Sequence, residues 1–240
     1  MHCGTWTRAL DTSWRQQVID YGIQAAAGLP ILHALPLSWL GTAKMPAYPP
    51  GWGLTAGLTA TQTQNLLAEI AYDQSQWNYQ LIGTSNALGA YQVSTQTLEN
   101  YGFLAPGSNA AYGNNCVNHQ TCWRPTPKRN VNNSYSNYLN NTTSLTSFLS
   151  NTVTQDYLAL QMIHDLYYGL TNIDAIQSTD AADVVAGMIY VAWTVGVGTP
   201  ATNVNSSGTG AWGWRYNNVS TPLTANAFNS GRYAVTVLTQ

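Results

Sequence analysis

The sequence contains very little charge. Of its 240 residues, 8 are Lys or Arg and 10 are Asp or Glu, so charged side chains make up 8% of the chain, about a third of the share in an ordinary soluble domain. The chain also lacks a basic run and has a net charge of −2, which argues against nucleic acid as a partner because a groove for phosphates needs clustered cations. Since 45% of the residues are hydrophobic, the composition is not that of a disordered protein, and we expect the chain to fold.

Phe is almost missing as well, and the other aromatic residues take its place. The chain has 3 Phe against 15 Tyr and 9 Trp. Tyr and Trp add a hydrogen-bonding group to a flat ring, which favours them at wet interfaces and on carbohydrate platforms. Together with abundant Asn, Thr, Ser and Gln, they indicate a surface suited to sugars or to stable assemblies.

Long uninterrupted apolar runs are missing too. The segment Gly22–Leu40 has about the length of a membrane span, but it contains Pro30, His33 and Pro36. Two prolines and an imidazole argue against a transmembrane helix, so we predict a buried or partner-facing segment. The first 22 residues carry four charges and no early apolar core, which is not the pattern of a secretory signal.

Helical periodicity dominates the rest of the chain. Apolar residues recur at helical spacing in residues 59–77, 91–104, 143–170 and 178–196. Few segments alternate with a period of two, so we predict an all-α or α-dominated fold. A turn-rich stretch before residue 58 divides the chain into an N-terminal extension, residues 1–58, and a domain, residues 59–240.

Capping residues and helix breakers give the expected ends of these helices. Thr residues precede the first helix, and Ser178 or Thr179 can cap the last one, which Gly196 can end. Residues 105–142 and the chain from residue 204 onward are predicted to be mostly loop. In that last part, Trp212 and Trp214 are spaced as on an extended segment, with one side chain buried and the other exposed.

Three cysteines are present, and two of them leave alternatives open. Cys116 and Cys122 are separated by six positions in a loop, a spacing that a small disulfide accommodates. With His119 between them they also form C-x2-H-x2-C, which offers zinc three ligands and needs a fourth from His2 or Cys3. Free thiols are the third alternative. We predict no cofactor and no metal.

Three further segments, in this order along the chain, contain residues typical of one enzyme family. They are IAYDQSQW (70–77), ALGAYQVS (87–94) and AWTVGVG (192–198). Together they resemble motifs of the lytic transglycosylase and goose-type lysozyme branch of the lysozyme-like superfamily. The residues that fall on motif positions are Ser75, Trp77, Gly89, Tyr91, Gln92, Ala192, Trp193, Gly196 and Gly198, and Thr194 stands where the family has Asn.

The resemblance covers about residues 60–220, and it implies a fold and a ligand. The implied fold is a pair of α-helical lobes with a groove for an alternating N-acetylated glycan, so the implied ligand is peptidoglycan. The resemblance makes Ser75, Gly89, Tyr91, Gln92, Trp193 and Thr194 the expected substrate-binding residues, although the spacing of Tyr190 and Trp193 also fits a helix core. The later string Arg215-Tyr216-Asn217 is similar to one found in many members.

One departure from the family concerns the catalytic acid. The family's catalytic Glu falls on Gln74, and an amide can neither protonate the glycosidic oxygen nor accept a proton afterwards. Loss of a general acid costs about 10²–10⁴ in rate. Asp73 and Glu69 on the same helix are the alternative acids, but they lie roughly 100° and 140° around the helix from Gln74, and Glu69 is otherwise interpreted as a helix-surface residue. Glu99 on the next predicted helix is a further carboxylate.

The sequence thus leaves two functions open. The first is an enzyme that cleaves peptidoglycan glycan strands, either by hydrolysis or with an anhydro product. The second is a retired enzyme, kept as a binding or structural module. Low charge, polar aromatics and an unrelated N-terminal extension resemble tail or baseplate components of tailed bacteriophages, so we expect a virion protein whose partners are peptidoglycan and other virion structural proteins.

Overall fold

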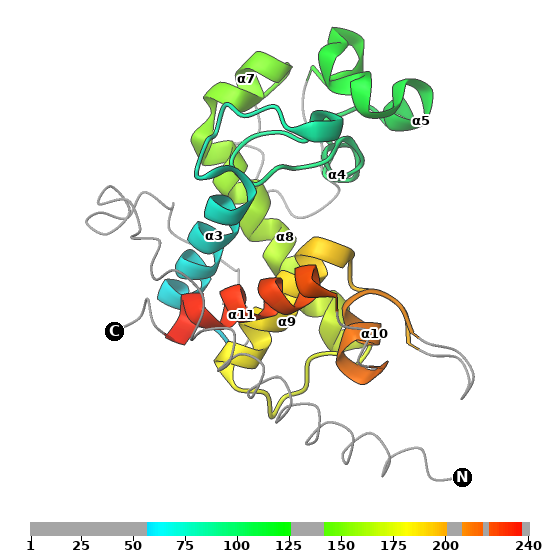
Figure 1. Ribbon diagram of the computed structural model, residues 1–240. Helices are drawn as coiled ribbons and strands as arrows, with labels where there is room; N and C mark the ends of the chain where they lie inside the picture. Colours follow the sequence, from blue (N-terminus) through cyan, green and yellow to red (C-terminus); the bar gives the residue numbers. More distant parts are fainter. Residues whose placement is uncertain (1–56, 126–141, 201–207, 218–220, 237–240) are drawn as a thin grey trace. The chain divides into compact units, whose positions relative to one another are not determined.

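The computed structural model describes residues 57–125, 142–200, 208–217 and 221–236 (Figure 1). Nearly all regular structure in these residues is helical, which confirms the predicted α-dominated fold. The helices are α3 Ala60–Ser75, α4 Thr95–Asn100, α5 Ser108–Tyr112, α7 Leu145–Ser150, α8 Thr152–Asn172, α9 Ala182–Val195, α10 Gly210–Asn217 and α11 Pro222–Thr236. Three short 3₁₀ helices cover Thr84–Asn86, Gly113–Asn118 and Gln120–Cys122. Within the described ranges, β-pairing is limited to isolated bridges.

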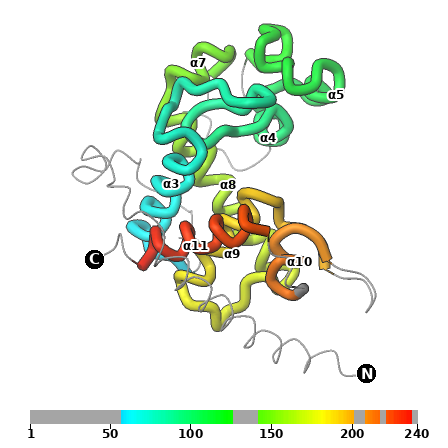
Figure 2. The backbone as a smooth tube through the Cα atoms, viewed as in Figure 1, coloured from blue at the N-terminus to red at the C-terminus, as the bar shows by residue number. Residues whose placement is uncertain are grey.

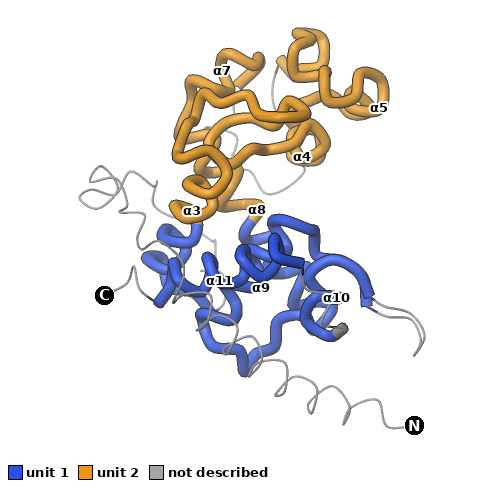
Figure 3. Tube along the Cα trace, viewed as in Figure 1, with its two compact units in different colours: residues 1–34, 55–66, 163–240 blue, residues 35–54, 67–162 orange. Residues whose placement is uncertain are grey.

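The described residues form two compact units (Figure 3). Those in residues 55–66 and 163–240 belong to unit 1, and those in residues 67–162 belong to unit 2. Helices α3 and α8 contribute residues to both units. Unit 2 carries the first two motif segments, and unit 1 carries the third.

The core of unit 1 is built on α9 and α11, which lie side by side (Figure 2). Residues Val185–Ala192 of α9 are all buried. The two helices approach closely at Gly187 and Gly231: a Cβ on Gly231 would lie 2.6 Å from the carbonyl oxygen of Ala186. Small residues at this crossing therefore permit backbone-to-backbone packing.

Most of the described residues after residue 204 are helical, in α10 and α11, so the loop expected there is wrong for them. Trp212 and Trp214 lie on α10 rather than on an extended segment. Trp214 is buried against Phe228, with ring centroids 4.7 Å apart, and Trp212 is half-buried. Three glycines in residues 208–213 lower the helix propensity of this segment, so its sequence does not predict a helix. The helix is stabilised instead by the tertiary packing of Trp214 and of the fully buried Ala211.

The predicted helix starts and ends are partly confirmed. The Thr59 hydroxyl accepts a 3.2 Å hydrogen bond from the Gln62 amide, while Gln62 Oε1 accepts from the Thr59 amide at 2.9 Å, a reciprocal cap for α3. Gly196, with φ of 80°, follows the last residue of α9 as expected. The other end of α9 differs, because Ala181 occupies the N-cap position without a side-chain hydrogen bond.

Two other segments differ from the expectation in length or type. The helix predicted over residues 91–104 is only α4, which Ser94 caps by accepting from the Thr97 amide. Part of the predicted loop over residues 105–142 is helical, since α5 and two 3₁₀ helices fill residues 108–122. The long helix predicted from residue 143 is divided into α7 and α8 at Asn151.

Some predictions fall on residues outside the described ranges. These are the N-terminal extension up to residue 56, its apolar segment Gly22–Leu40, and most of the loop that follows residue 125. None of the helices that the structure describes has both the length and the apolar character needed to cross a membrane.

Candidate functional site

The first motif segment ends α3 and turns the chain. Gln74 and Ser75 are the last two residues of the helix, and both are half-buried. Gln76 and Trp77 follow with φ of 54° and 59°, in the left-handed region. The Trp77 indole donates to the carbonyl of Ala68 at 2.9 Å and its ring packs on Tyr72, with centroids 4.6 Å apart. This contact fixes the direction in which the chain leaves the helix.

The second motif segment folds back on itself. The amide and carbonyl of Leu88 bond to the carbonyl and amide of Val93, both at 2.9 Å, and the Gly89 amide donates to the Leu81 carbonyl at 2.8 Å. Gly89 has φ of 73° and Gln92 has φ of 47°. Residues 89–92, which we call the motif loop, form the tip of this narrow turn.

The structure brings the first two motif segments together. The Ser75 hydroxyl donates a 2.8 Å hydrogen bond to the carbonyl of Ala90, fifteen residues later. The Ser75 hydroxyl also accepts from the Asn78 amide at 3.0 Å, and it lies 3.1 Å from the Ala71 carbonyl oxygen, a second acceptor for its one hydrogen. The helix end that carries Gln74 is therefore joined to the motif loop by a hydrogen bond.

The side chains of the motif loop are engaged within the protein. Tyr91 is 1% exposed, and Gln92 is half-buried with its Nε2 donating to the Gly89 carbonyl at 2.8 Å. A Cβ at Gly83 would collide with the Gln92 amide, so Gln92 packs directly over that glycine.

Two residues that the sequence analysis missed support the motif loop from α8. Gln155 Oε1 accepts from the Ala90 amide at 3.0 Å, and its Nε2 donates to the carbonyls of Tyr79 and Phe148, both at 3.0 Å. Asp156 Oδ1 accepts from the hydroxyls of Tyr79 at 2.7 Å and Tyr91 at 2.8 Å. Gln155 and Asp156 are both buried.

The buried Asp156 carboxyl is electrostatically perturbed. Burial raises its pKa from 3.8 to about 6, and the hydrogen bonds from Tyr79 and Tyr91 oppose this shift. Burial, together with the negative charge of Asp156, also raises the pKa of both tyrosines, so the phenols stay protonated and donate. A carboxyl with such a pKa changes charge in a physiological pH range.

The carboxylates expected as alternative acids occupy three different environments. Glu69 is 5% exposed, so its interpretation as a helix-surface residue is wrong. Asp73 is exposed near the end of α3. Glu99 accepts from the amides of Gly107 and Asn109, both at 2.7 Å, and thereby caps the start of α5. Glu99 thus has a structural role in unit 2.

The third motif segment belongs to unit 1. Trp193 and Thr194 are half-buried at the end of α9, and the Thr194 hydroxyl donates to the Tyr190 carbonyl at 3.1 Å. Gly196 accepts from the Ala211 amide at 3.0 Å. A Cβ on Gly198 would lie 2.9 Å from the Cα of Gly210 and would collide with the Thr209 carbonyl. The two glycines therefore end a helix and permit close packing against the start of α10.

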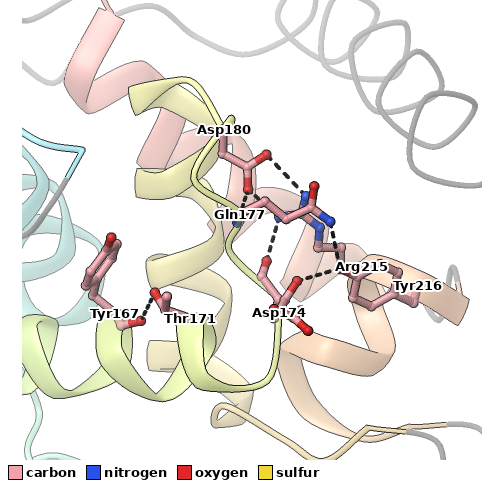
Figure 4. A network of polar contacts seen from close by, with 8 residues as sticks. Tyr167, Thr171, Asp174, Gln177, Asp180, Arg215 and Tyr216 are labelled. Carbon is pink, nitrogen blue, oxygen red and sulfur yellow. Dashed lines mark hydrogen bonds and ion pairs between the residues drawn. The ribbon is translucent and has the colours of Figure 1, made fainter. Parts of the chain in front are cut away.

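Arg215 of the Arg-Tyr-Asn string is a structural residue (Figure 4). Its side chain is fully buried, and its Nη1 donates to the carbonyl of Ala175 and to Asp180 Oδ2, both at 2.6 Å. Asp180 Oδ2 also accepts from the Gln177 amide at 2.8 Å, and the Tyr216 hydroxyl donates to the Asp174 carbonyl. Arg215 and Tyr216 thus attach α10 to the turn that precedes α9.

Of the three alternatives for Cys116 and Cys122, the structure shows the disulfide. Cys116 and Cys122 are bridged and buried, with Cα atoms 5.9 Å apart. Because bridged sulfurs are not thiolates, the zinc alternative and the free-thiol alternative are both wrong for this pair. His119 instead pairs with Asn115 at 3.1 Å and lies against the ring of Tyr112. In the described ranges no cluster of three His, Cys, Asp or Glu side chains is arranged to hold a metal ion.

The site in unit 2 is therefore a helix end, a tight loop and two supporting residues of α8. Its chemistry is that of backbone and amide hydrogen bonding beside a buried carboxyl, and Gln74 at the helix end adds a side-chain amide. Comparison with family models, curated proteins and solved structures finds no match to this chain.

Proposed function

We propose that this chain is a lysozyme-like protein directed at peptidoglycan, and that it binds the glycan strand without efficient cleavage. The observation that carries the proposal is the 2.8 Å hydrogen bond between the Ser75 hydroxyl and the Ala90 carbonyl. It joins the two segments that resemble the family's catalytic helix end and its glycan-lining loop. Such a contact is expected if the two segments form one site, and in this sense it supports the proposal.

The weak or absent cleavage follows from Gln74. The amide of Gln74 cannot deliver a proton to a leaving glycosidic oxygen. Of the alternatives, Glu99 is used as a helix cap and Glu69 is buried within α3. Gln is close to Glu in shape and can still hydrogen-bond a sugar, so binding survives a substitution that removes the acid.

The test compares the full chain with Gln74→Glu on purified peptidoglycan. We expect both proteins to sediment with insoluble sacculi and only Gln74→Glu to release soluble muropeptides. Gln76→Glu is the matched control, because it adds the same group to an exposed residue two positions later. If neither protein bound sacculi, the proposal would be wrong. If the unaltered chain released muropeptides, another carboxylate would be the acid, and Glu69→Gln and Asp73→Asn would identify it.

We also propose that the protein is a structural component of a phage tail or baseplate. The low charge of 8% and the apolar segment Gly22–Leu40 support this placement, because a segment so apolar is expected to be covered by a partner. Other virion proteins would take up residues 1–58, and residues 59–240 would face the cell wall. Co-assembly of the chain with its neighbours should require residues 1–58, and co-assembly without them would contradict the placement.

A further inference from the structure

Two adjacent residues of α8 hold the motif loop, although neither lies in a motif. Gln155 and Asp156 together make four hydrogen bonds to the segment 79–91. Two of these bonds reach the motif loop, at Ala90 and Tyr91, which lie 65 positions earlier in the chain than their partners. We propose that Gln155 and Asp156 are positioning residues that keep the motif loop in its glycan-binding conformation. This inference rests on the proposed function, which makes the motif loop a binding segment.

Gln155 and Ser75 hold the two backbone polar groups of Ala90. The Ala90 amide donates to Gln155 Oε1 at 3.0 Å, while the Ala90 carbonyl accepts from the Ser75 hydroxyl at 2.8 Å. The Gln155 amide has a single orientation, because its Nε2 donates to two carbonyls, those of Tyr79 and Phe148. Ala90 is thus held at both polar atoms by side chains of different helices.

Asp156 fixes the two ends of the same segment. Both tyrosine hydroxyls donate to one atom, Asp156 Oδ1, and the rings of Tyr79 and Tyr91 meet edge to face at 6.4 Å. In the described part of the chain, the titratable side chains that face Asp156 are these two phenols. Asp156 therefore connects the start of the segment to its tip through one acceptor atom.

The position of Ala90 determines that of Gln92. Gln92 has a left-handed backbone, and its side-chain Nε2 donates to the Gly89 carbonyl. That carbonyl belongs to the same peptide group as the Ala90 N–H, so a rotation of this peptide group displaces the acceptor of the Gln92 hydrogen bond. An ionised Asp156 accepts the two hydroxyl hydrogen bonds more strongly than a neutral one does. The two hydroxyl hydrogen bonds, which oppose the effect of burial on the pKa of Asp156, should consequently hold the loop more tightly above that pKa of about 6, even though burial of the charge lowers the stability of the whole fold in the same pH range.

The first measurement is made on the full chain without a ligand. Backbone NMR shifts of Ala90 and Tyr91 should titrate near pH 6 in the unaltered protein and should not titrate in Asp156→Asn. Asn keeps an oxygen at the Oδ1 position and removes the charge. The backbone shifts of Ala90 and Tyr91 in Asp156→Asn should therefore match those of the unaltered protein at low pH. Asp165→Asn, the same change at a partly exposed site on the same helix, is the control and should leave the titration intact.

The second measurement is binding to insoluble sacculi as a function of pH. We expect the unaltered chain to bind more tightly above about pH 6, Asp156→Asn to bind independently of pH, and Asp156→Leu and Gln155→Leu to bind about tenfold more weakly or worse, because they leave buried donors unpaired. Near-ultraviolet circular dichroism verifies that each variant is folded.

The outcomes separate the positioning role from the proposed function. If folded Asp156→Leu and Gln155→Leu bound like the unaltered chain, or if Asp156→Asn kept the pH dependence of binding, the positioning role would be wrong. If the unaltered chain itself did not bind sacculi, the proposed function would fail, and the NMR titration alone would decide whether Asp156 holds the loop. Unchanged Ala90 and Tyr91 shifts in Asp156→Leu would overturn the inference in that case as well.

Discussion

The Ser75 hydroxyl and the Ala90 carbonyl oxygen lie 2.8 Å apart, and this hydrogen bond joins the end of α3 to the motif loop. The same hydroxyl contacts the Ala71 carbonyl and accepts from the Asn78 amide. One small side chain thus satisfies polar groups from three places in the chain. A serine that ends a helix usually bonds only within its own turn, so the long-range bond distinguishes Ser75.

Ser75→Ala should destabilise the protein by about 1–3 kcal/mol. The substitution removes a donor to the Ala90 carbonyl and an acceptor for the Asn78 amide, and unpaired polar groups at a part-buried site cost about this much. The measurement is the free energy of unfolding from urea titration. The dependence of this free energy on urea concentration should be the same in both proteins, which excludes a change in the unfolded state.

Ser150→Ala is the matched control for that measurement. Ser150 ends α7 as Ser75 ends α3, and its hydroxyl donates to the Thr146 carbonyl four residues earlier at 2.9 Å. The Ser150 hydroxyl bonds to carbonyls of α7 itself, and the side chain is exposed. We expect a loss below about 0.5 kcal/mol. Equal losses for Ser75→Ala and Ser150→Ala would show that the bond to Ala90 contributes nothing.

Gly89→Ala should disrupt the motif loop. Gly89 has φ of 73°, and a Cβ there would collide with the Gln155 side-chain amide. The left-handed backbone costs an alanine about 1–2 kcal/mol, and displacement of Gln155 costs the hydrogen bonds that this residue makes. The free energy of unfolding should fall by more than the backbone cost alone, and the Ala90 amide should lose its protection from hydrogen exchange.

Gly107→Ala separates these two costs. Gly107 has nearly the same φ, 79°, but a Cβ on it would have no neighbour within 4 Å. Its loss of stability should therefore equal the backbone cost of about 1–2 kcal/mol. A loss for Gly89→Ala no larger than that for Gly107→Ala would mean that Gln155 does not pack against the loop as described.

The helices that sequence reasoning predicted are those whose signals are local. The α3 helix combines an apolar face at Leu66, Leu67 and Ile70 with a cap at Thr59, and both features lie within the element. The α10 helix has no such signal, because its glycines lower its helix propensity and its stability comes from Trp214 packing on a residue of α11. Elements held by distant contacts are not visible in a local pattern.

The same reasoning explains what was missed at the site. Ser75 and the motif loop were singled out because their residues form recognisable strings. Gln155 and Asp156 directly precede the apolar run from Tyr157 to Leu160 of α8, and adjacent buried polar residues in a helix are a signal that a partner exists elsewhere. The sequence does not say which partner, since Ala90 and Tyr91 lie 65 positions away.

The stability of the protein should depend on pH through Asp156. Burial raises the folded pKa of Asp156 from 3.8 to about 6, so the folded state binds the proton more tightly than the unfolded state does. The contribution of this group to stability is therefore complete below about pH 4 and is lost as the pH rises through about 6. A shift of this size corresponds to about 3 kcal/mol.

Asp156→Asn removes this dependence and provides the measurement. Its free energy of unfolding, compared with that of the unaltered protein, should improve by about 3 kcal/mol between about pH 4 and about pH 7. Asp165→Asn is the control, because Asp165 lies on the same helix with its side chain 36% exposed. A constant difference between Asp156→Asn and the unaltered protein across this range would show that Asp156 titrates normally.

Asp180→Asn should be among the most destabilising single changes in unit 1. Asp180 and Arg215 form an ion pair in which both side chains are 0% exposed, and Arg215 also donates to the Ala175 carbonyl. Removing the carboxylate leaves a buried guanidinium without its counter-charge, which costs about 3–5 kcal/mol. Urea unfolding of both proteins under identical conditions measures this difference.

A second ion pair of unit 1 is more exposed, and we expect its removal to destabilise the protein less. Arg232 and Asp183 also form a hydrogen-bonded pair, at 2.8 Å and 2.9 Å, but their side chains are 26% and 20% exposed. Water reaches the guanidinium when the partner is removed, so Asp183→Asn should cost about 1 kcal/mol or less. Added salt should reduce the effect of Asp183→Asn and leave that of Asp180→Asn nearly unchanged, because buried charges are screened little. Similar losses for the two substitutions would contradict the assignment of Arg215 as a buried structural residue.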